Sequence, residues 1–81
     1  MLERLAERVR VLRDARGMTQ EKAAERAKLD VKHWQDVEAA RTNPTVATLI
    51  GLARALGVSV GQLFDEPGAV DSDTYARRRT R

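Results

Sequence analysis

The side chains that could carry chemistry are concentrated in the second of two short helical patterns between Met18 and Asn43. This second pattern opens on Asp30 and carries polar side chains, Lys32 and Gln35 among them, on its outward face. Ammonium and amide groups can hydrogen-bond to the edges of bases. Two helices separated by a break of three to four residues can place the second one in the major groove of DNA. The spacing therefore indicates a nucleic-acid contact rather than a reaction centre.

Catalysis and metal binding have little support in the sequence. The chain has one histidine, no cysteine and only two serines, Ser59 and Ser72. It has no Gly-rich phosphate loop and no run of residues with metal-ligand spacing. Asp36 and Glu38 are two positions apart, so on a helix they face different directions and form no carboxylate pair. We therefore expect no enzyme, no metal site and no cofactor.

Length and composition indicate one small globular domain. Of the 81 residues, 42% are hydrophobic and 33% are charged, which is ordinary for a soluble protein. No apolar run approaches the roughly 18 residues that cross a bilayer, and the first residues lack the apolar block of a signal peptide. We expect a cytoplasmic, nucleoid-associated protein with no membrane contact. Because there is no cysteine, helix packing or a partner subunit must supply the stability.

Charge is distributed unevenly along the chain, which has a net charge of +3. Residues 1–29 hold eight basic and five acidic side chains, whereas residues 30–64 hold three of each. Residues 65–81 are expected to form a charged flexible tail, with weak DNA contact by its arginines as the alternative. In this tail the acidic residues Asp65, Glu66, Asp71 and Asp73 precede Arg77, Arg78, Arg79 and Arg81.

Apolar residues at helical spacing predict five short helices and no strand. Gly17 ends the first helix. Thr19 can cap a second helix from Gln20 to Ala27, and Asp30 can cap a third that ends before Asn43-Pro44. Leu2, Leu5, Val9 and Leu12 share the face of the first helix that is predicted to lie in the core, and Ala23, Ala24 and Ala27 of the second helix are predicted to face inward. In the third helix, Val31, Trp34 and Val37 recur at helical spacing. The outer side of the first helix is assigned to Arg4, Glu7, Arg8, Arg10 and Asp14.

The last two helices are predicted from capping signals. Thr45 can cap a fourth helix that Gly57 closes. Ser59 and Gln62 fit a reciprocal capping box that opens a fifth helix, which the Asp-Glu-Pro-Gly stretch after Phe64 stops. The broad apolar face of the fourth helix comprises Val46, Leu49, Ile50, Leu52, Ala53 and Leu56.

Taken in order, RVRVLRDARGMTQEKAAERAKLD and NPTVATLIGLARALGVSVGQLF resemble the phage-repressor-like helix-turn-helix family, also called the XRE or Cro-like family. The likeness covers about residues 4–64. It implies an all-α, compact, five-helix lambda-repressor-like domain over residues 1–64, with the helix-turn-helix at about 20–39. It also implies a sequence-specific transcriptional regulator, most often a repressor, that acts as a homodimer on operator DNA.

The resemblance implies that the first two turns of the third helix read base edges. Lys32 would contact guanine or a phosphate, Gln35 would contact adenine, and Asp36 could accept from a cytosine amino group. Val31 could touch a thymine methyl group or belong to the core. His33 lies alongside, and the alternative for it is a neutral surface imidazole.

Further roles follow from the same resemblance. Gln20 would brace a DNA phosphate at a helix N-terminus, with a plain surface residue as the alternative. Arg13 and Glu38 would form an ion pair that ties the first helix to the third. Trp34 would occupy the inward apolar site and could fill space left by Ala23. The loop along the phosphate backbone would comprise Arg41, Thr42 and Asn43.

Three positions depart from the family pattern. Asp36 places a negative charge where the family often has a basic or amide side chain. Lys28 and Ala40 stand where the family commonly has glycine, and a left-handed conformation at a non-glycine residue costs on the order of 1 kcal/mol. Either both corners tolerate that cost, or the third helix runs longer than usual.

The partner predictions are double-stranded DNA and a second copy of the chain, bound through the fourth and fifth helices. Roles as a phage repressor, an antitoxin, a restriction–modification controller or an autoregulator fit equally well. The alternative is a protein-interaction module that keeps the fold, binds a partner protein and no longer reads DNA. Asp36 and the negative charge of residues 30–40 favour this alternative.

Overall fold

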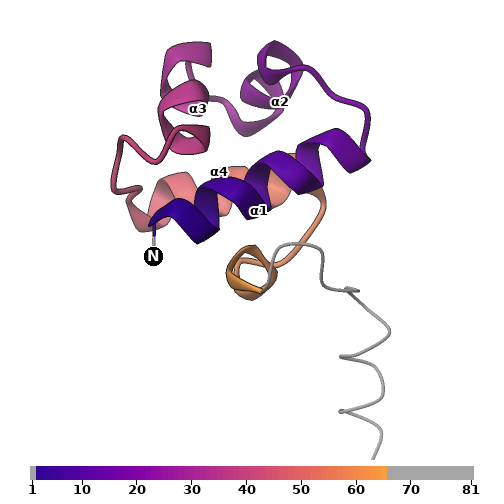
Figure 1. Ribbon diagram of the computed structural model, residues 1–81. Helices are drawn as coiled ribbons and strands as arrows, with labels where there is room; N and C mark the ends of the chain where they lie inside the picture. The colour runs from indigo at the N-terminus through magenta and orange to yellow at the C-terminus, as the bar shows by residue number, and fades with distance from the viewer. Residues whose placement is uncertain (1, 66–81) are drawn as a thin grey trace, which may run out of the picture.

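A computed structural model describes residues 2–65 of the chain (Figure 1). This part contains the α-helices α1 (Leu2–Ala15), α2 (Gln20–Ala27), α3 (Val31–Glu38) and α4 (Val46–Leu56), followed by a short 3-10 helix, η1 (Gly61–Phe64). Residues 2–65 contain no strand, so the all-α class is confirmed for them. The predicted charged flexible tail spans residues 65–81, and all of it except Asp65, including its arginines, lies outside the described residues. The domain boundary at residue 64 stays a prediction.

The prediction of five helices is wrong, because the fifth element is a single 3-10 turn. The capping box is present: the Ser59 amide donates to Gln62 Oε1 at 2.8 Å, and the Gln62 amide donates to Ser59 Oγ at 3.2 Å. The backbone hydrogen bonds of η1 then join residues three apart, as in a 3-10 helix: the Leu63 amide, for example, donates to the Val60 carbonyl at 3.0 Å. Pro67 follows closely in the sequence, so too few residues are available for a regular α-helix.

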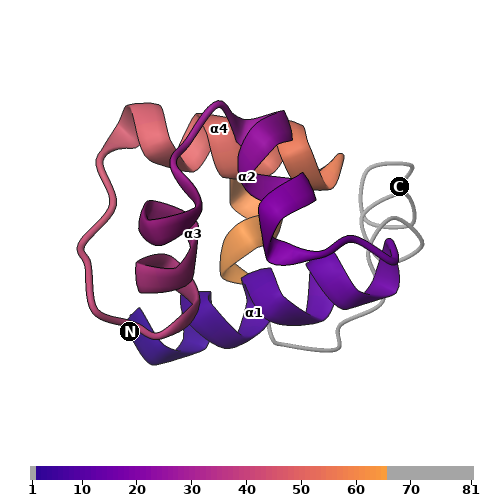
Figure 2. The ribbon, with the colours of Figure 1, turned by 90° about the horizontal axis from the view of Figure 1, so that it is seen from above.

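Two layers of helices form the domain (Figures 1 and 2). One layer contains α1 and α4, and α2 and α3 lie across it, while η1 lies on the opposite side. The core between them includes the fully buried side chains of Trp34, Leu52, Leu56, Leu63 and Val9. Trp34 and Ala23 belong to this same buried cluster, as expected from the sequence.

Helices α2 and α4 approach each other closely. The small side chains of α2 are buried, as the sequence predicts. A Cβ atom added to Gly51 of α4 would lie 2.9 Å from the carbonyl oxygen of Ala27. Glycine is therefore required at position 51 for the backbones to come this near.

Each of the four α-helices is followed by a residue in the left-handed conformation. Two of these are glycines, but Lys28 (φ 61°) and Ala40 (φ 58°) are not. The chain closes in the same way at both: the Leu29 amide donates to the Ala24 carbonyl at 2.9 Å, and the Arg41 amide donates to the Asp36 carbonyl at 2.8 Å. Helix α3 ends at Glu38, so both corners accept a non-glycine residue and the third helix is not extended.

Arg8 is buried, although the helical pattern placed it on the outer side of α1. Its side chain is 1% exposed, and its Nε donates to the Gln62 carbonyl at 3.0 Å. A guanidinium group can be buried when its donors are satisfied. Arg8 therefore links α1 to η1, a long-range role that periodicity alone cannot reveal.

One further sequence expectation needs correction, and the apolar face of α4 is partly exposed. Asp30 occupies the N-cap position of α3, but its side chain makes no capping hydrogen bond. The apolar face predicted for α4 is only partly buried, because Val46 is 72% exposed and Ile50 is 48% exposed. Folding of residues 2–65 therefore leaves apolar surface on α4 uncovered.

Candidate nucleic-acid interface

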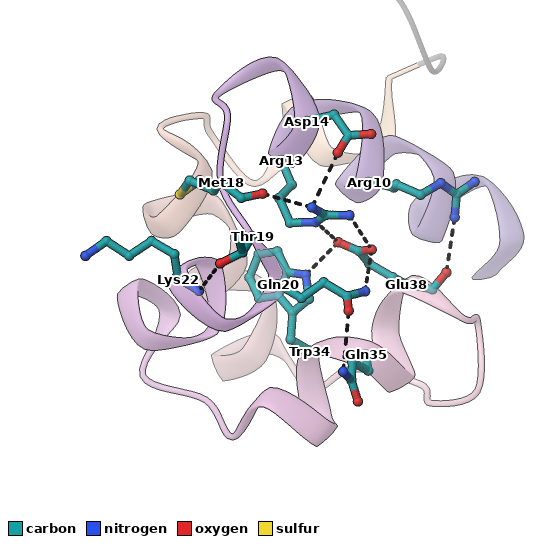
Figure 3. Close-up of polar contacts among 10 residues, drawn as sticks. All are labelled: Arg10, Arg13, Asp14, Met18, Thr19, Gln20, Lys22, Trp34, Gln35 and Glu38. Carbon is teal, nitrogen blue, oxygen red and sulfur yellow. Dashed lines mark hydrogen bonds and ion pairs between the residues drawn. The ribbon is translucent and has the colours of Figure 1, made fainter.

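Arg13 of α1 and Glu38 of α3 form a two-pronged ion pair (Figure 3). Arg13 Nε lies 2.6 Å from Glu38 Oε2, and Arg13 Nη2 lies 3.1 Å from Glu38 Oε1. The remaining Arg13 nitrogen, Nη1, donates to the Met18 carbonyl at 2.8 Å. One guanidinium group thus holds the end of α3 and the loop before α2 against α1.

Glu38 also accepts hydrogen bonds from two other elements. Trp34 Nε1, one turn earlier on α3, donates to Oε2 at 2.6 Å, and Gln20 Nε2 of α2 donates to Oε1 at 2.9 Å. Burial raises the pKa of Glu38, but the hydrogen bonds from Arg13, Trp34 and Gln20 outweigh it and hold the pKa below its ordinary value. The hydrogen bond between Arg13 and Glu38 raises the pKa of Arg13. Both groups are therefore charged at neutral pH, and the orientation of α3 is set jointly by α1 and α2.

Gln20 and Gln35 extend this network toward the surface. Gln35 Nε2 donates to Gln20 Oε1 at 3.4 Å, and both side chains are half-buried (Figure 3). In the structure the Gln20 amide therefore faces Glu38 and Gln35. A phosphate contact by Gln20 stays a prediction, and its link between α2 and α3 was not found from the sequence.

The outer face of α3 carries a second ionic cluster. Lys32 Nζ lies 3.1 Å from Asp36 Oδ1, and Arg41 Nη2 also lies 3.1 Å from this oxygen. The hydrogen bond from Lys32, together with that from Arg41, lowers the pKa of Asp36 below its ordinary value. Asp36 is thus ionised and neutralises part of the charge of its two neighbours.

The structure brings only some of the predicted contact residues together. Lys32, Asp36 and Arg41 are joined by ion pairs, and Lys32, Val31 and Arg41 are exposed, whereas His33 and Thr42 are half-buried. Asn43 is also exposed, but it lines a hollow with Leu2, Leu5, Pro44, Leu49 and Phe64. The candidate surface therefore centres on α3 and Arg41.

The described part of the chain shows no cluster of side chains suited to binding a metal ion. Residues 2–65 contain no group of three or more His, Cys, Asp or Glu side chains arranged to hold a metal ion. None of the helices in this range combines the length and the apolar character needed to cross a membrane.

Comparison with known proteins identifies the family. Residues 4–66 match the family model described as a helix-turn-helix domain. The chain belongs to the helix-turn-helix domain family. It is 41% identical over 66 residues to the control protein C.SmaI of Serratia marcescens. The aligned region covers 82% of this chain and 79% of that protein. The arrangement of helices around the Glu38 network is therefore that of a helix-turn-helix domain.

Three further similarities agree. The chain is 36% identical over 62 residues to the immunity repressor protein of Bacillus phage phi105, covering 76% of this chain. It spans 43% of that repressor, and 48% of a matching HTH-type transcriptional regulator from Deinococcus deserti. The crystal structure of the restriction-modification controller protein C.AhdI from Aeromonas hydrophila superimposes with a TM-score of 0.76 and 33% identity, covering 78% of this chain and 96% of that one.

Proposed function

We propose that this helix-turn-helix protein is a sequence-specific DNA-binding transcriptional regulator that inserts α3 into the major groove. The observation that carries the proposal is the division of α3 into two faces. Trp34 and Glu38 bind inward to the domain, whereas Lys32 and Gln35 lie on the side that carries the candidate surface. A helix held rigidly from behind can present amide and ammonium donors to base edges in a fixed register. The relatives' names as a repressor and a control protein support this function.

The phosphate backbone would be bound beside α3. We assign Arg41, Thr42 and Asn43 to backbone contacts, because the loop that contains them follows directly from the reading helix. Gln20 stands at the first position of α2, where a helix N-terminus favours an anion. Its Nε2 has two N–H groups, of which one donates to Glu38, so the other would donate to the phosphate.

A repressor of this kind would work as a homodimer, and the exposed apolar surface supports that arrangement. Val46 and Ile50 are one turn apart on α4 and are both exposed. Val60 and Phe64, beside and within η1, add further exposed apolar side chains. Pairing of two copies through α4 and η1 would place two α3 helices about one DNA turn apart.

The alternative of a protein-interaction module loses its main support in the structure. It depended on the negative charge of residues 30–40, but Glu38 is bound inward to Arg13 and Asp36 is paired with Lys32 and Arg41. Two of the three carboxylates in this segment are therefore matched by basic side chains, whereas Asp30 is exposed and makes no capping hydrogen bond.

The proposal is tested by the salt dependence of binding to a random-sequence duplex. A DNA-binding protein releases counterions, so its affinity should fall steeply as salt rises from about 50 to 200 mM. Lys32→Ala should weaken this binding, whereas Arg54→Ala, which removes an exposed cation from α4, should leave it unchanged. Absence of binding by the wild-type chain at about 50 mM salt would contradict the proposed function and support the protein-interaction module.

A further inference from the structure

Asp36 binds Arg41 through both its backbone and its side chain. The Asp36 carbonyl accepts the Arg41 amide at 2.8 Å, and Asp36 Oδ1 accepts from Arg41 Nε at 3.2 Å and from Nη2 at 3.1 Å. The left-handed residue Ala40 turns the chain back over the last turn of α3, which makes this double contact possible. The position of Arg41 is therefore coupled to α3 through one carboxylate.

Asp36 also forms an ion pair with Lys32, one turn earlier on α3. Lys32 Nζ lies 3.1 Å from Oδ1 and 3.2 Å from Oδ2, and the four-residue spacing places both side chains on one face of the helix. The side chains of Lys32 and Arg41 are 75% and 61% exposed, whereas that of Asp36 is 25% exposed. The carboxylate thus lies between two cations that reach further into solvent.

Stability is a poor explanation for this cluster. Ion pairs between exposed side chains contribute about 0 to 1 kcal/mol, because solvent and salt screen them. On a surface that faces DNA phosphates, a carboxylate also reduces the attraction to every sequence alike. The arrangement is better explained by an effect on which sequences are bound.

We propose that Asp36 is a positioning and specificity-determining residue that holds Lys32 and Arg41 in one cluster and makes DNA binding more selective at the expense of its strength. This inference rests on the proposed function. Asp36 takes up part of the donor capacity of Lys32 and Arg41, so on DNA of arbitrary sequence fewer of their donors reach phosphates, and the carboxylate itself repels the phosphates. At a site where a cytosine or adenine amino group faces α3, the carboxylate gains a new donor. Only such sites offset the cost of keeping a carboxylate on this surface.

The test compares Asp36→Asn with Glu25→Gln. Glu25 of α2 is exposed and ion-paired with Lys22 Nζ at 3.7 Å, so each variant removes one negative charge from an ion-paired carboxylate, with one cation partner for Glu25 and two for Asp36. Binding would be measured on two probes: a random-sequence 20-base-pair duplex, at several salt concentrations, and a duplex selected by the wild-type protein from a random pool. Unfolding curves of both variants would show that the fold is retained.

The expected result is a gain of affinity accompanied by a loss of discrimination. Asp36→Asn should bind the random duplex several-fold more tightly, and its slope of log affinity against log salt should be steeper by about one, the value for one additional phosphate contact. The ratio of affinities for the selected and random duplexes should fall about tenfold or more, since one well-made base contact discriminates by about 1–3 kcal/mol. Glu25→Gln should leave this ratio unchanged.

Three results would overturn the inference. The first is an unchanged ratio and slope for Asp36→Asn. The second is an equal change in both variants, which would indicate an effect of net charge alone. The third is failure of the wild-type protein to bind either duplex, which would refute the proposed function as well. Wild-type binding with an unaltered ratio in Asp36→Asn refutes only the role of Asp36.

Discussion

Trp34 and Glu38, one turn apart on α3, are joined by a hydrogen bond of 2.6 Å from the buried indole nitrogen to Oε2. The aromatic ring fills the core, and its polar edge orients the carboxylate that Arg13 and Gln20 also bind. Packing and electrostatics therefore fix the same helix at the same point. A helix held in this way can present its outer face to a ligand without further ordering.

Trp34→Phe should destabilise the domain, because it removes the donor to Glu38. The aromatic core is largely retained, so most of the loss reports on this hydrogen bond. A hydrogen bond to a charged group contributes about 1.5–3 kcal/mol, and we expect a loss near 2 kcal/mol in urea unfolding followed by circular dichroism. In a Glu38→Gln background the same substitution should cost less, because the charged acceptor is gone. Equal costs in both backgrounds would show that Trp34 acts through volume alone.

Arg13→Met should be more damaging, because it leaves the Glu38 carboxylate in place without its cation. Breaking a pair of this kind costs about 3 kcal/mol or more when the remaining charge is shielded from water. Arg54→Met is the matched control: Arg54 is exposed on α4, and its replacement should change the free energy of unfolding by about 0.5 kcal/mol or less. Similar unfolding midpoints for the two variants would argue against a structural role for the ion pair.

Stability should decrease in acid because the pKa of Glu38 is lower in the folded state than its ordinary value of 4.5. A lowered pKa means that the unfolded chain binds the proton more readily. The contribution of Glu38 is therefore present above about pH 4.5 and is lost as the pH falls through the folded-state pKa. Trp34, the only tryptophan, allows unfolding to be followed by fluorescence. Glu38→Gln should be less stable at pH 7 and should show a weaker decrease in stability below pH 4.5; an unchanged acid profile would exclude Glu38 as its source.

Ala40→Gly should stabilise the domain, since Ala40 has φ 58° and glycine adopts this conformation without steric cost. The expected gain is up to about 1 kcal/mol in the free energy of unfolding. Ala39, the preceding residue, has φ −95°, so Ala39→Gly should instead destabilise by increasing the freedom of the unfolded chain. A loss of stability in Ala40→Gly would mean that the left-handed turn is not retained in solution.

The helices themselves were predictable because their signals are local. Thr19 and Thr45 both make the expected caps, with hydrogen bonds of 3.0 and 3.1 Å to the amides of Lys22 and Thr48. The periodicity that buries Trp34 and Val37 also needs no tertiary information. Family resemblance, rather than periodicity, supplied the idea that Arg13 and Glu38 interact.

Features that depend on distant contacts were not predictable in the same way. Burial of Arg8 depends on the Gln62 carbonyl, 54 residues away, and an arginine in a helical pattern is ordinarily assigned to the surface. The resemblance assigns Gln20 to a phosphate, and its hydrogen bond to Glu38 could not be predicted because it depends on the angle between α2 and α3. Asp36 departs from the family pattern in the sequence, and its bond to Arg41 could not be predicted because the turn at Ala40 that brings Arg41 onto it depends on backbone geometry.

The central claim is that α3 reads DNA sequence, and the ratio of affinities for selected and scrambled duplexes tests it most directly. Duplexes would be selected by the wild-type chain from a random pool, and both affinities would be measured at one salt concentration. We predict a ratio of about 10³ or more, with a tenfold or larger decrease in Gln35→Ala and little change in Arg54→Ala. Equal affinities for the selected and scrambled duplexes, or selection of no common sequence, would contradict the account.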